Sequence, residues 1–292
     1  MIRVCLSGLG RTGKEIAKAI LDQKDLKLVS VICSPESDKL GKDLGEYLGC
    51  IRIGIIIESA ANLEQSIFWT KPNVVIDFSN PLTAIRNAKV LSKMKINIVI
   101  GTTGFSKTSL KKLFVLARNY NIGIVHAPNI TLGVNVLMLL TNLAANILNN
   151  YDFQITEIHH KLKKDIPSGT AVKIAKEIEK GLLFSETKIN GTSIPINSVR
   201  AGDMVSRHEV MIIGEDDKME ISHESFSRKA FALGAIKAVE FIHKKAGYFE
   251  INDVLNLQKV LFDYIKNEGT GLNKKFICYT ANANQNQPLQ AL

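Results

Sequence analysis

The chain has 292 residues, of which 46% are hydrophobic and 22% are charged, and its formal net charge is +9. This composition excludes a disordered protein, and the length suits about two globular domains. Aromatic residues make up 7% of the chain and are not interleaved with Lys or Arg. The pattern therefore argues against a nucleic-acid partner and favours small anions as ligands of this basic chain.

The four cysteines, Cys5, Cys33, Cys50 and Cys278, form no CxxC pair and no cluster with histidine. Neither a zinc site nor a disulfide framework is therefore predicted, and no metal is expected. The N-terminus shows no signal-peptide pattern, and no apolar run approaches the ~18 residues of a membrane span. We expect a protein of the reducing cytoplasm with no membrane partner.

The first part of the chain alternates short apolar strands with helices. Residues 2–7 form the first apolar run, and helical spacing follows from Lys14 to Leu21. Further strand-like runs are 26–33, 73–78, 96–100 and 122–126, and helical stretches are 81–94 and 106–118. Strands that are apolar on both faces and alternate with helices predict an α/β domain with a doubly wound parallel sheet of the Rossmann type.

After about residue 130 the pattern changes. Helices are predicted at 133–148, 169–182 and 229–245, a strand at 152–160, and a hairpin from 207–213 and 217–223. The half-buried alternation of these strands predicts an α+β domain with an open mixed sheet.

Two domains follow from this change. We expect a dinucleotide-binding domain at 1–130, completed by about 239–292, and a substrate-binding and oligomerisation domain at 131–238. Leu261, Tyr264 and Ile265 suggest one more amphipathic turn against the first domain. The polar tail from about residue 281 is expected to be disordered.

A glycine motif follows the first strand and opens the first helix. Gly8, Gly10 and Gly13 fit G-x-G-x-x-G. The motif serves a tight turn, close approach of the backbone to a pyrophosphate and close packing of helix on strand. The helix N-terminus then offers free N–H groups to the phosphates. In this strand–turn–helix setting the motif predicts a dinucleotide site in preference to a plain turn.

The end of the second strand bears on the choice of nucleotide. A carboxylate usually stands there to hold the ribose 2′-hydroxyl, but this strand ends in Cys33 and Ser34. Without that negative charge a 2′-phosphate meets less repulsion, and Ser34 or Lys39 could contact it. We expect the cofactor to be NADPH or NADH, with NADPH or dual use favoured.

The most informative stretch, Glu157–Ala171, reads EIHHKLKKDIPSGTA. Two adjacent histidines, His159 and His160, end a predicted strand, where alternation should turn them to opposite faces. The segment 168–170 then opens a helix, whose N–H groups and hydroxyls form an anion pocket, and Lys163 adds a point charge. The stretch is typical of a carboxylate site beside a histidine that can transfer a proton.

Each of these residues alone has a simpler interpretation. Ser168 can be an ordinary helix N-cap, His160 a hydrogen-bonded core histidine, and the lysines a solvated loop. Only their combination within the twelve residues from His159 to Thr170 favours a site.

The combination resembles the signature HHxxKxDxPSGTA of the 4-hydroxy-tetrahydrodipicolinate reductase (dihydrodipicolinate reductase) family. Other segments that resemble family motifs in the same order are Asp77–Pro81, Gly101–Gly104, Ala127–Asn135, Arg200–His208, Glu220–Ala235 and Gly247–Leu255. The resemblance covers roughly residues 1–257 and leaves 258–292 without a family interpretation. It implies hydride transfer from a nicotinamide to a conjugated cyclic imine in lysine and diaminopimelate synthesis, and a homotetramer.

The resemblance also implies roles for single residues. His159 is the proton donor, and Lys163 assists protonation and substrate binding. The substrate dicarboxylate is bound by His160, Ser168, Gly169 and Thr170. The nucleotide is contacted by Gly8, Leu9, Gly10, Arg11, Thr12 and Gly13, by Gly101, Thr102 and Thr103, and by Ala127, Pro128, Asn129 and Ile130; Cys33 and Ser34 end the second strand beside it.

The sequence departs from the family pattern at some positions. Ser7 and Thr12 replace a glycine and a methionine of the family's loop, and Lys161 and Leu162 replace an arginine and a frequent histidine. Two alternatives stay open: a relative that acts on another amino-acid-derived substrate, such as a diamino acid dehydrogenase, and a nucleotide-sensing regulator without catalysis. The intact signature argues against the first, and the presence of His159 and Lys163 argues against the second.

Overall fold

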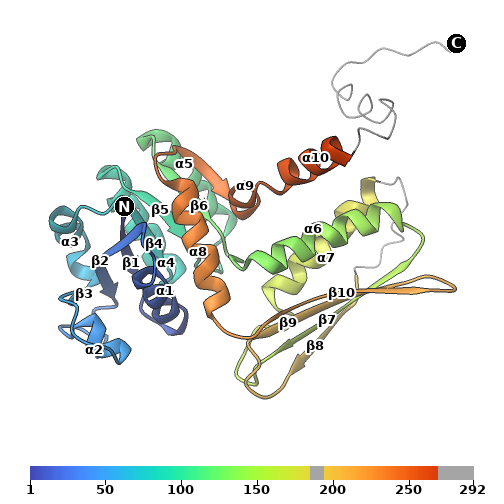
Figure 1. Ribbon diagram of the computed structural model, residues 1–292, viewed down its shortest axis with the longest axis horizontal. Coiled ribbons are helices and arrows are strands. Elements are labelled where there is room, and N and C mark those ends of the chain that lie inside the picture. The colour runs from blue at the N-terminus through green and yellow to red at the C-terminus, as the bar shows by residue number, and fades with distance from the viewer. Residues whose placement is uncertain (185–193, 269–292) are drawn as a thin grey trace, which may run out of the picture. The chain divides into compact units, whose positions relative to one another are not determined.

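The computed structural model describes residues 1–184 and 194–268 (Figure 1). One compact unit covers Met1–Leu255, and a second begins at Asn256 and contains helix α10 (Leu257–Glu268). The predicted turn near residue 261 is thus helical, but the side chains of Leu261, Tyr264 and Ile265 lie outside the described part, as does the tail from residue 281.

The first sheet is parallel and has seven strands in the order β11-β6-β5-β4-β1-β2-β3. Its strands are β1 (Ile2–Ser7), β2 (Leu26–Cys33), β3 (Ile57–Ser59), β4 (Val74–Asp77), β5 (Asn97–Ile100), β6 (Gly123–His126) and β11 (Gly247–Glu250). Chain order reverses at β1, which pairs with β2 on one side and β4 on the other. This is the switch point at which doubly wound sheets bind ligands.

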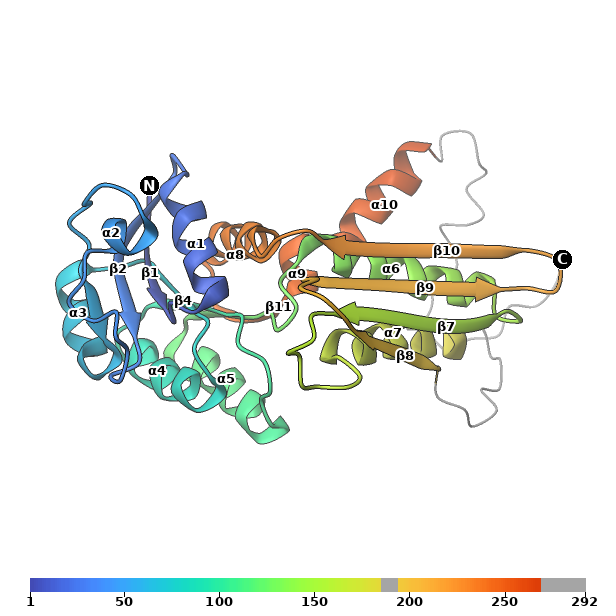
Figure 2. The same cartoon turned by 90° about the horizontal axis from the view of Figure 1, so that it is seen from below.

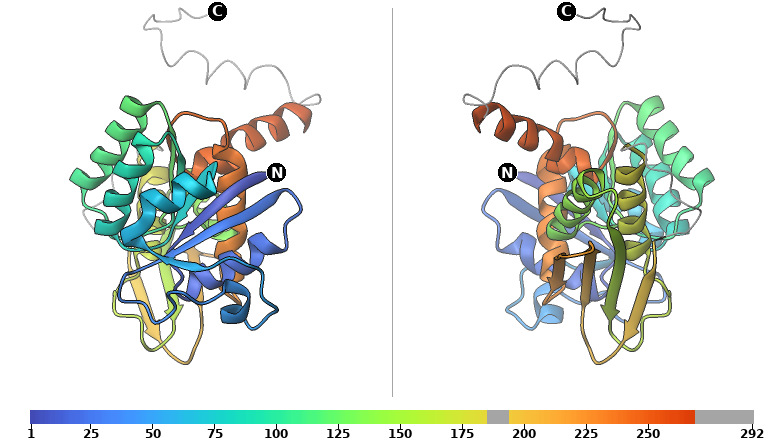
Figure 3. Two further views of the ribbon diagram at one scale, coloured as in Figure 1. Left: turned by 90° about the vertical axis from the view of Figure 1, so that its left-hand side faces the viewer. Right: turned by 90° about the vertical axis from the view of Figure 1, so that its right-hand side faces the viewer.

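Helices cover both faces of this sheet, which explains why its strands are apolar throughout. One face packs against α1 (Arg11–Leu21), the short α2 (Leu44–Leu48) and α8 (Lys229–Ile242). The other packs against α3 (Leu63–Thr70), α4 (Pro81–Lys93) and α5 (Lys107–Tyr120), with a 3₁₀ turn at Ala60–Asn62. In Figures 2 and 3, α1 and α8 lie on one side of the strands and α4 and α5 on the other. The predicted doubly wound sheet is confirmed.

The second sheet is mixed and has four strands in the order β10-β9-β7-β8. They are β7 (Asp152–His159), β8 (Ile196–Arg200), β9 (Ser206–Ile213) and β10 (Lys218–Ser225). Strands β7 and β8 are parallel, and the other pairs are antiparallel. Helices α6 (Leu132–Ile147) and α7 (Gly169–Phe184) pack against one face, as Figure 2 shows. The predicted open mixed sheet is therefore also confirmed.

Several elements were not predicted. They are α2, α3, β3, β8, β11 and the short helix α9 (Ile251–Leu255). All three missed strands are three to five residues long and carry no clear alternation. Because β11 joins the edge of the first sheet beside β6, that sheet is completed by a segment far along the chain. None of the helices within the described ranges has the length and apolarity that crossing a bilayer requires.

Candidate active site

The glycine loop lies between β1 and α1, as predicted. Gly8 has a φ of +97°, and a Cβ placed on it would lie 2.5 Å from the carbonyl oxygen of Phe78. A Cβ on Gly13 would lie 2.0 Å from the carbonyl oxygen of Gly8, whereas one on Gly10 would meet nothing within 4 Å. Gly10 caps α1 without a side-chain hydrogen bond, so the N–H groups of the first turn are free for an anion. This loop fits the pyrophosphate of a dinucleotide.

A cavity of about 290 Å³ adjoins this loop and the end of β2. Its lining includes the predicted residues Gly8, Leu9, Gly10, Cys33 and Ser34. Two cations, Lys39 and Arg86, also line it, and Lys39 Nζ donates to the carbonyl of Leu9 in the glycine loop at 2.9 Å. Glu36 does not line the cavity and instead accepts a hydrogen bond from Ser34 Oγ. Arg86, on α4, was not predicted because its sequence context carries no nucleotide motif.

The ends of β5 and β6 carry the other predicted nucleotide segments. Thr103, Pro128 and Asn129 line the cavities next to the glycine loop. The remaining residues of the two segments support the backbone: Gly101 packs where a Cβ would lie 2.1 Å from the Phe78 ring. Thr102, Ala127 and Ile130 are buried. The structure thus divides these segments into residues that line a cavity and residues that support the backbone behind it.

A second cavity, of about 260 Å³, brings the two predicted site regions together. The nucleotide loop contributes Arg11 and Thr12, and the signature segment contributes His159, His160, Lys163 and Thr170. The two histidines were expected to face opposite sides of the strand, and both line this cavity. Strand β7 ends at His159, so His160 is free of strand alternation and lines the same cavity.

The start of α7 is built around Ser168. Its Oγ accepts a hydrogen bond from the Ala171 N–H at 3.1 Å and lies 3.3 Å from His208 Nε2. Ser168 is therefore an N-cap, and at 1% exposure it lies behind the cavity surface. Gly169 and Thr170 follow it and line a third cavity of about 570 Å³, together with Lys163. Lys163 pairs with Asp165 at 2.8 Å, so its ammonium is held near the helix start.

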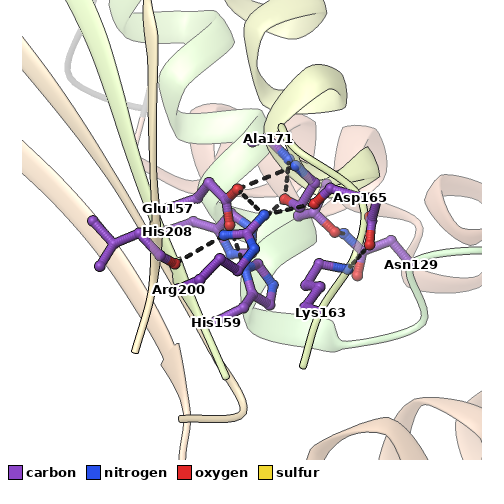
Figure 4. A network of polar contacts seen from close by, with 11 residues as sticks. Asn129, Glu157, His159, Lys163, Asp165, Ala171, Arg200 and His208 are labelled. Carbon is purple, nitrogen blue, oxygen red and sulfur yellow. Dashed lines mark hydrogen bonds and ion pairs between the residues drawn. The ribbon is translucent and has the colours of Figure 1, made fainter. Parts of the chain in front are cut away.

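Behind the second cavity lies a buried polar network that the sequence interpretation missed (Figure 4). Glu157 Oε2 accepts a hydrogen bond from Nδ1 of His159, and Glu157 Oε1 accepts from Arg200 Nη2 at 2.7 Å. Strand register explains the cluster, because His208 of β9 pairs with Glu157 and Arg200 of β8 pairs with His159. Two signals were present in the sequence: Glu157 occupies a core-facing position of an alternating strand, and Arg200 and His208 begin and end one of the segments that resemble family motifs.

The network shifts the protonation of its members. Burial, with a contribution from His159, lowers the pKa of His208 to about 3, so its ring is neutral at pH 7. Burial also lowers the pKa of His159, although Glu157 opposes this effect. The pKa of Glu157 lies below its ordinary value because hydrogen bonds, above all from Arg200, outweigh the effect of burial. The carboxylate is therefore charged near neutral pH.

Glu157, His159 and His208 offer ligand atoms within 4.8 Å of one another, a spacing that could also suit a metal ion. The guanidinium of Arg200 already balances the carboxylate, with Nη2 2.7 Å from its oxygen. A second positive charge beside it would meet repulsion in this buried setting. Glu157, His159 and Arg200 thus form a buried network of hydrogen bonds and ion pairs.

Comparisons with known proteins place this geometry in a family. The family model described as dihydrodipicolinate reductase, N-terminus, matches residues 2–130, and the model for the C-terminus matches residues 133–255. The 4-hydroxy-tetrahydrodipicolinate reductase of Methanococcus aeolicus is 37% identical over 273 residues, 89% of this chain and 100% of the relative. The 4-hydroxy-tetrahydrodipicolinate reductase of Methanocaldococcus jannaschii is 35% identical over 274 residues, which are 90% of this chain and 100% of the relative.

Solved structures of other proteins are also similar to this chain. A dipicolinate-bound dihydrodipicolinate reductase from Paenisporosarcina sp. TG-14 has a TM-score of 0.71 and 27% identity, covering 87% of this chain and 98% of its own. A DAP dehydrogenase of C. glutamicum, with a TM-score of 0.51 and 12% identity over 86% of this chain and 92% of its own, shares only the fold. Both halves of the chain match in order, and the chain therefore belongs to the dihydrodipicolinate reductase family.

Proposed function

We propose that this protein reduces 4-hydroxy-tetrahydrodipicolinate, which loses its 4-hydroxyl as water, to tetrahydrodipicolinate with a nicotinamide nucleotide, in the synthesis of diaminopimelate and lysine. One observation carries the proposal: Arg11 and Thr12 of the nucleotide loop line the same cavity as His159, His160 and Lys163. A hydride donor and a proton donor can therefore meet one small substrate. A dehydrogenase of another amino-acid-derived substrate is not favoured, because the DAP dehydrogenase likeness extends to the fold alone.

Different residues of the chain are proposed to bind the substrate, to protonate it and to fix the start of α7. When bound, the nicotinamide supplies the hydride. Lys163, held by Asp165 at 2.8 Å, holds the carboxylates of the substrate together with His160 and with Gly169 and Thr170 at the start of α7. His159 delivers the proton to the ring. Ser168 acts as the cap that fixes this helix start, while Gly169 and Thr170 face the ligand.

The proposed cofactor is NADPH, with NADH as a second substrate. Lys39 and Arg86 line the cavity at the end of β2, and the nearest carboxylate in sequence, Glu36, does not. Two cations near the ribose favour a 2′-phosphate, because a phosphate forms strong charge-assisted hydrogen bonds with them. Glu36 is exposed close by and can still accept from ribose hydroxyls, which would allow NADH.

The assembly belongs to the same proposal. We infer a cytoplasmic homotetramer whose subunits meet through the open face of the four-stranded sheet. Ile158 and Met211 lie on this face, opposite the side that α6 and α7 cover, and both are partly exposed. Burying such a face in a symmetric assembly also protects its edge strands. Sedimentation equilibrium that finds a stable monomer would contradict the tetramer.

The test of the function is the loss of nucleotide absorbance with freshly generated 4-hydroxy-tetrahydrodipicolinate. NADPH and NADH are assayed separately, because the ratio of their kcat/KM values reports the nucleotide preference. Rapid oxidation that depends on the substrate is expected. If the folded protein binds NADPH but does not oxidise it when 4-hydroxy-tetrahydrodipicolinate is added, the proposal is overturned. That result would point to a relative with another substrate.

A further inference from the structure

We propose that Glu157 is a positioning residue for the proton donor: its carboxylate holds the Nδ1 proton of His159 and thereby aims Nε2 at the substrate. The inference rests on the proposed role of His159. It adds to that role a buried carboxylate that does not touch the cavity. Glu157 has no exposed surface, and His159 is 6% exposed.

The contact between the two side chains fixes the tautomer. Glu157 Oε2 lies within hydrogen-bond distance of His159 Nδ1. An ionised carboxylate can only accept a hydrogen bond, so the proton between them sits on Nδ1. His159 lines the cavity, and with Nδ1 engaged only Nε2 is left for a ligand there. Figure 4 shows the carboxylate behind the ring, on the side away from Lys163.

Arg200 keeps the carboxylate charged and in place. Its Nη2 donates to Glu157 Oε1 at 2.7 Å and to the carbonyl of Asp165 at 2.6 Å. The N–H of Ser168 donates to the same Oε1 at 3.2 Å. These donors hold the carboxylate plane, so Oε2 must face the imidazole.

The carboxylate also supports the acid form of the ring. Burial lowers the pKa of His159, and Lys163 and Arg200 lower it further, whereas Glu157 raises it. A proton donor must carry its proton on Nε2, which requires the imidazolium when Nδ1 is already protonated. Glu157 therefore increases the fraction of His159 that is ready to donate near neutral pH.

The substitution Glu157→Gln isolates this effect. Its amide oxygen can still accept from Arg200 and Ser168, and those two donors prevent the amide from flipping. The NH₂ group then faces Nδ1 and donates to it, which leaves a neutral ring with its proton on Nε2. Neutral imidazole is a far weaker acid than imidazolium, so we expect kcat at pH 7 to fall about 10- to 100-fold. KM for the substrate should change by less than about threefold, because the helix start is retained.

The control is Glu46→Gln on the short helix α2. Glu46 also pairs with an arginine, Arg52, at 3.3 Å, but it is exposed and lines none of the three cavities. This variant removes one paired carboxylate without touching His159. Its kcat and its pH profile should match those of the wild type.

Two readouts separate positioning from mere structural support. In the pH profile of kcat, activity is lost as pH rises through the pKa of His159, and Glu157→Gln should move this decline to lower pH. In nucleotide-free protein with ¹⁵N-labelled histidine, NMR should show wild-type His159 protonated on Nδ1. The Gln variant should move the neutral ring to the Nε2–H tautomer, with His159→Asn identifying the signal.

The outcomes distinguish this inference from the proposed function. An Nε2–H tautomer in the wild type overturns it even if Glu157→Gln fails to fold. Unchanged kcat and an unchanged pH profile in a folded Gln variant overturn it as well. If the tautomer behaves as expected but the wild type oxidises no nucleotide with the substrate, the contact with Glu157 stands and the proposed function fails.

Discussion

The central strands of the seven-stranded sheet are buried on both faces, and β1 leads into a glycine-rich turn, whereas in β7 and β9 of the four-stranded sheet one face changes from apolar to polar along the strand. On β7 that face runs from Phe153 and Ile155 to Glu157 and His159. On β9 it runs from Ile212 and Val210 to His208, all buried. The first sheet thus offers mainly backbone N–H groups to its ligand, and the second offers buried side chains.

This difference teaches where each kind of chemistry can be placed. Phosphates need only free N–H groups and close approach, which a turn and a helix start provide locally. A proton donor needs a set tautomer and a tuned pKa, which require partners from several strands. On the buried face of β7 and β9, the polar end provides both: the side chains there are buried, and partners from neighbouring strands lie beside them.

The largest expected effect is on the proton donor. His159→Asn should lower kcat by on the order of 10²-fold or more, because a positioned acid is lost, while NADPH binding is retained. His160→Asn should instead raise KM, since His160 lines the cavity without a partner in the network. Steady-state kinetics of the two variants, with NADPH fluorescence for binding, check this. Near-normal kcat in His159→Asn would remove that residue from the role.

The next largest effect distinguishes two glycines, Gly10 and Gly13, of the loop and helix start that follow β1. Gly13→Ala should destabilise the fold by about 1–3 kcal/mol, since its Cβ would lie 2.0 Å from the carbonyl oxygen of Gly8. Gly10→Ala meets nothing within 4 Å, so its stability should be unchanged while affinity for NADPH drops. Urea unfolding and nucleotide titration measure the two quantities. Equal stability losses would show that the loop has no such division.

A pH experiment compares the two sheets directly. Burial lowers the pKa of His126, at the end of β6, to about 4, and that of His208 in the second sheet to about 3. The unfolded chain binds protons first, near pH 6.5, so each histidine removes stability as pH falls from 6.5 towards its folded pKa. At roughly 1.4 kcal/mol per pH unit, each costs about 2 kcal/mol between pH 6.5 and pH 5.

His126→Gln and His208→Gln should each reduce this acid loss, and the double variant should show the sum, because the residues lie in different cores. Urea unfolding at pH 6.5 and pH 5 measures the difference within each variant. An acid loss identical in wild type and variants would show that the two rings are solvated in the folded state.

The smallest expected effect concerns nucleotide choice. Lys39→Ala should raise KM for NADPH about tenfold and leave KM for NADH nearly unchanged, because a charge-assisted contact to the 2′-phosphate is lost. Lys42→Ala removes an exposed lysine three positions away and serves as the control. If KM rises equally for NADPH and NADH, Lys39 acts by stabilising the glycine loop through its hydrogen bond to Leu9, and not by binding the 2′-phosphate.

The sequence predicted what local patterns encode. The parallel sheet, its glycine loop and the signature segment follow from apolar runs, G-x-G-x-x-G spacing and short motifs. The contacts of Glu157 with His159 and Arg200 could not be found this way, although Arg200 begins a motif segment, because β8 is a strand of five residues that no alternation reveals. That His159 and His160 line one cavity depended on where β7 ends, and strand ends are set by tertiary contacts. The predicted domain boundaries at 130 and 238 stay a prediction.

The late position of α8 and β11 has a consequence for the nascent chain. Ala235, Val239 and Ile242 of α8 are buried in the same core as Val4 and Leu6 of β1, and β11 pairs with β6. The ribosome delivers these segments about 100 residues after β6, at some 5–20 residues per second. The four-stranded sheet is continuous in sequence between them. The seven-stranded sheet therefore begins with β1 but is completed only after the four-stranded sheet has been synthesised. Until then, the face of the sheet that α8 covers stays exposed, for several seconds of synthesis.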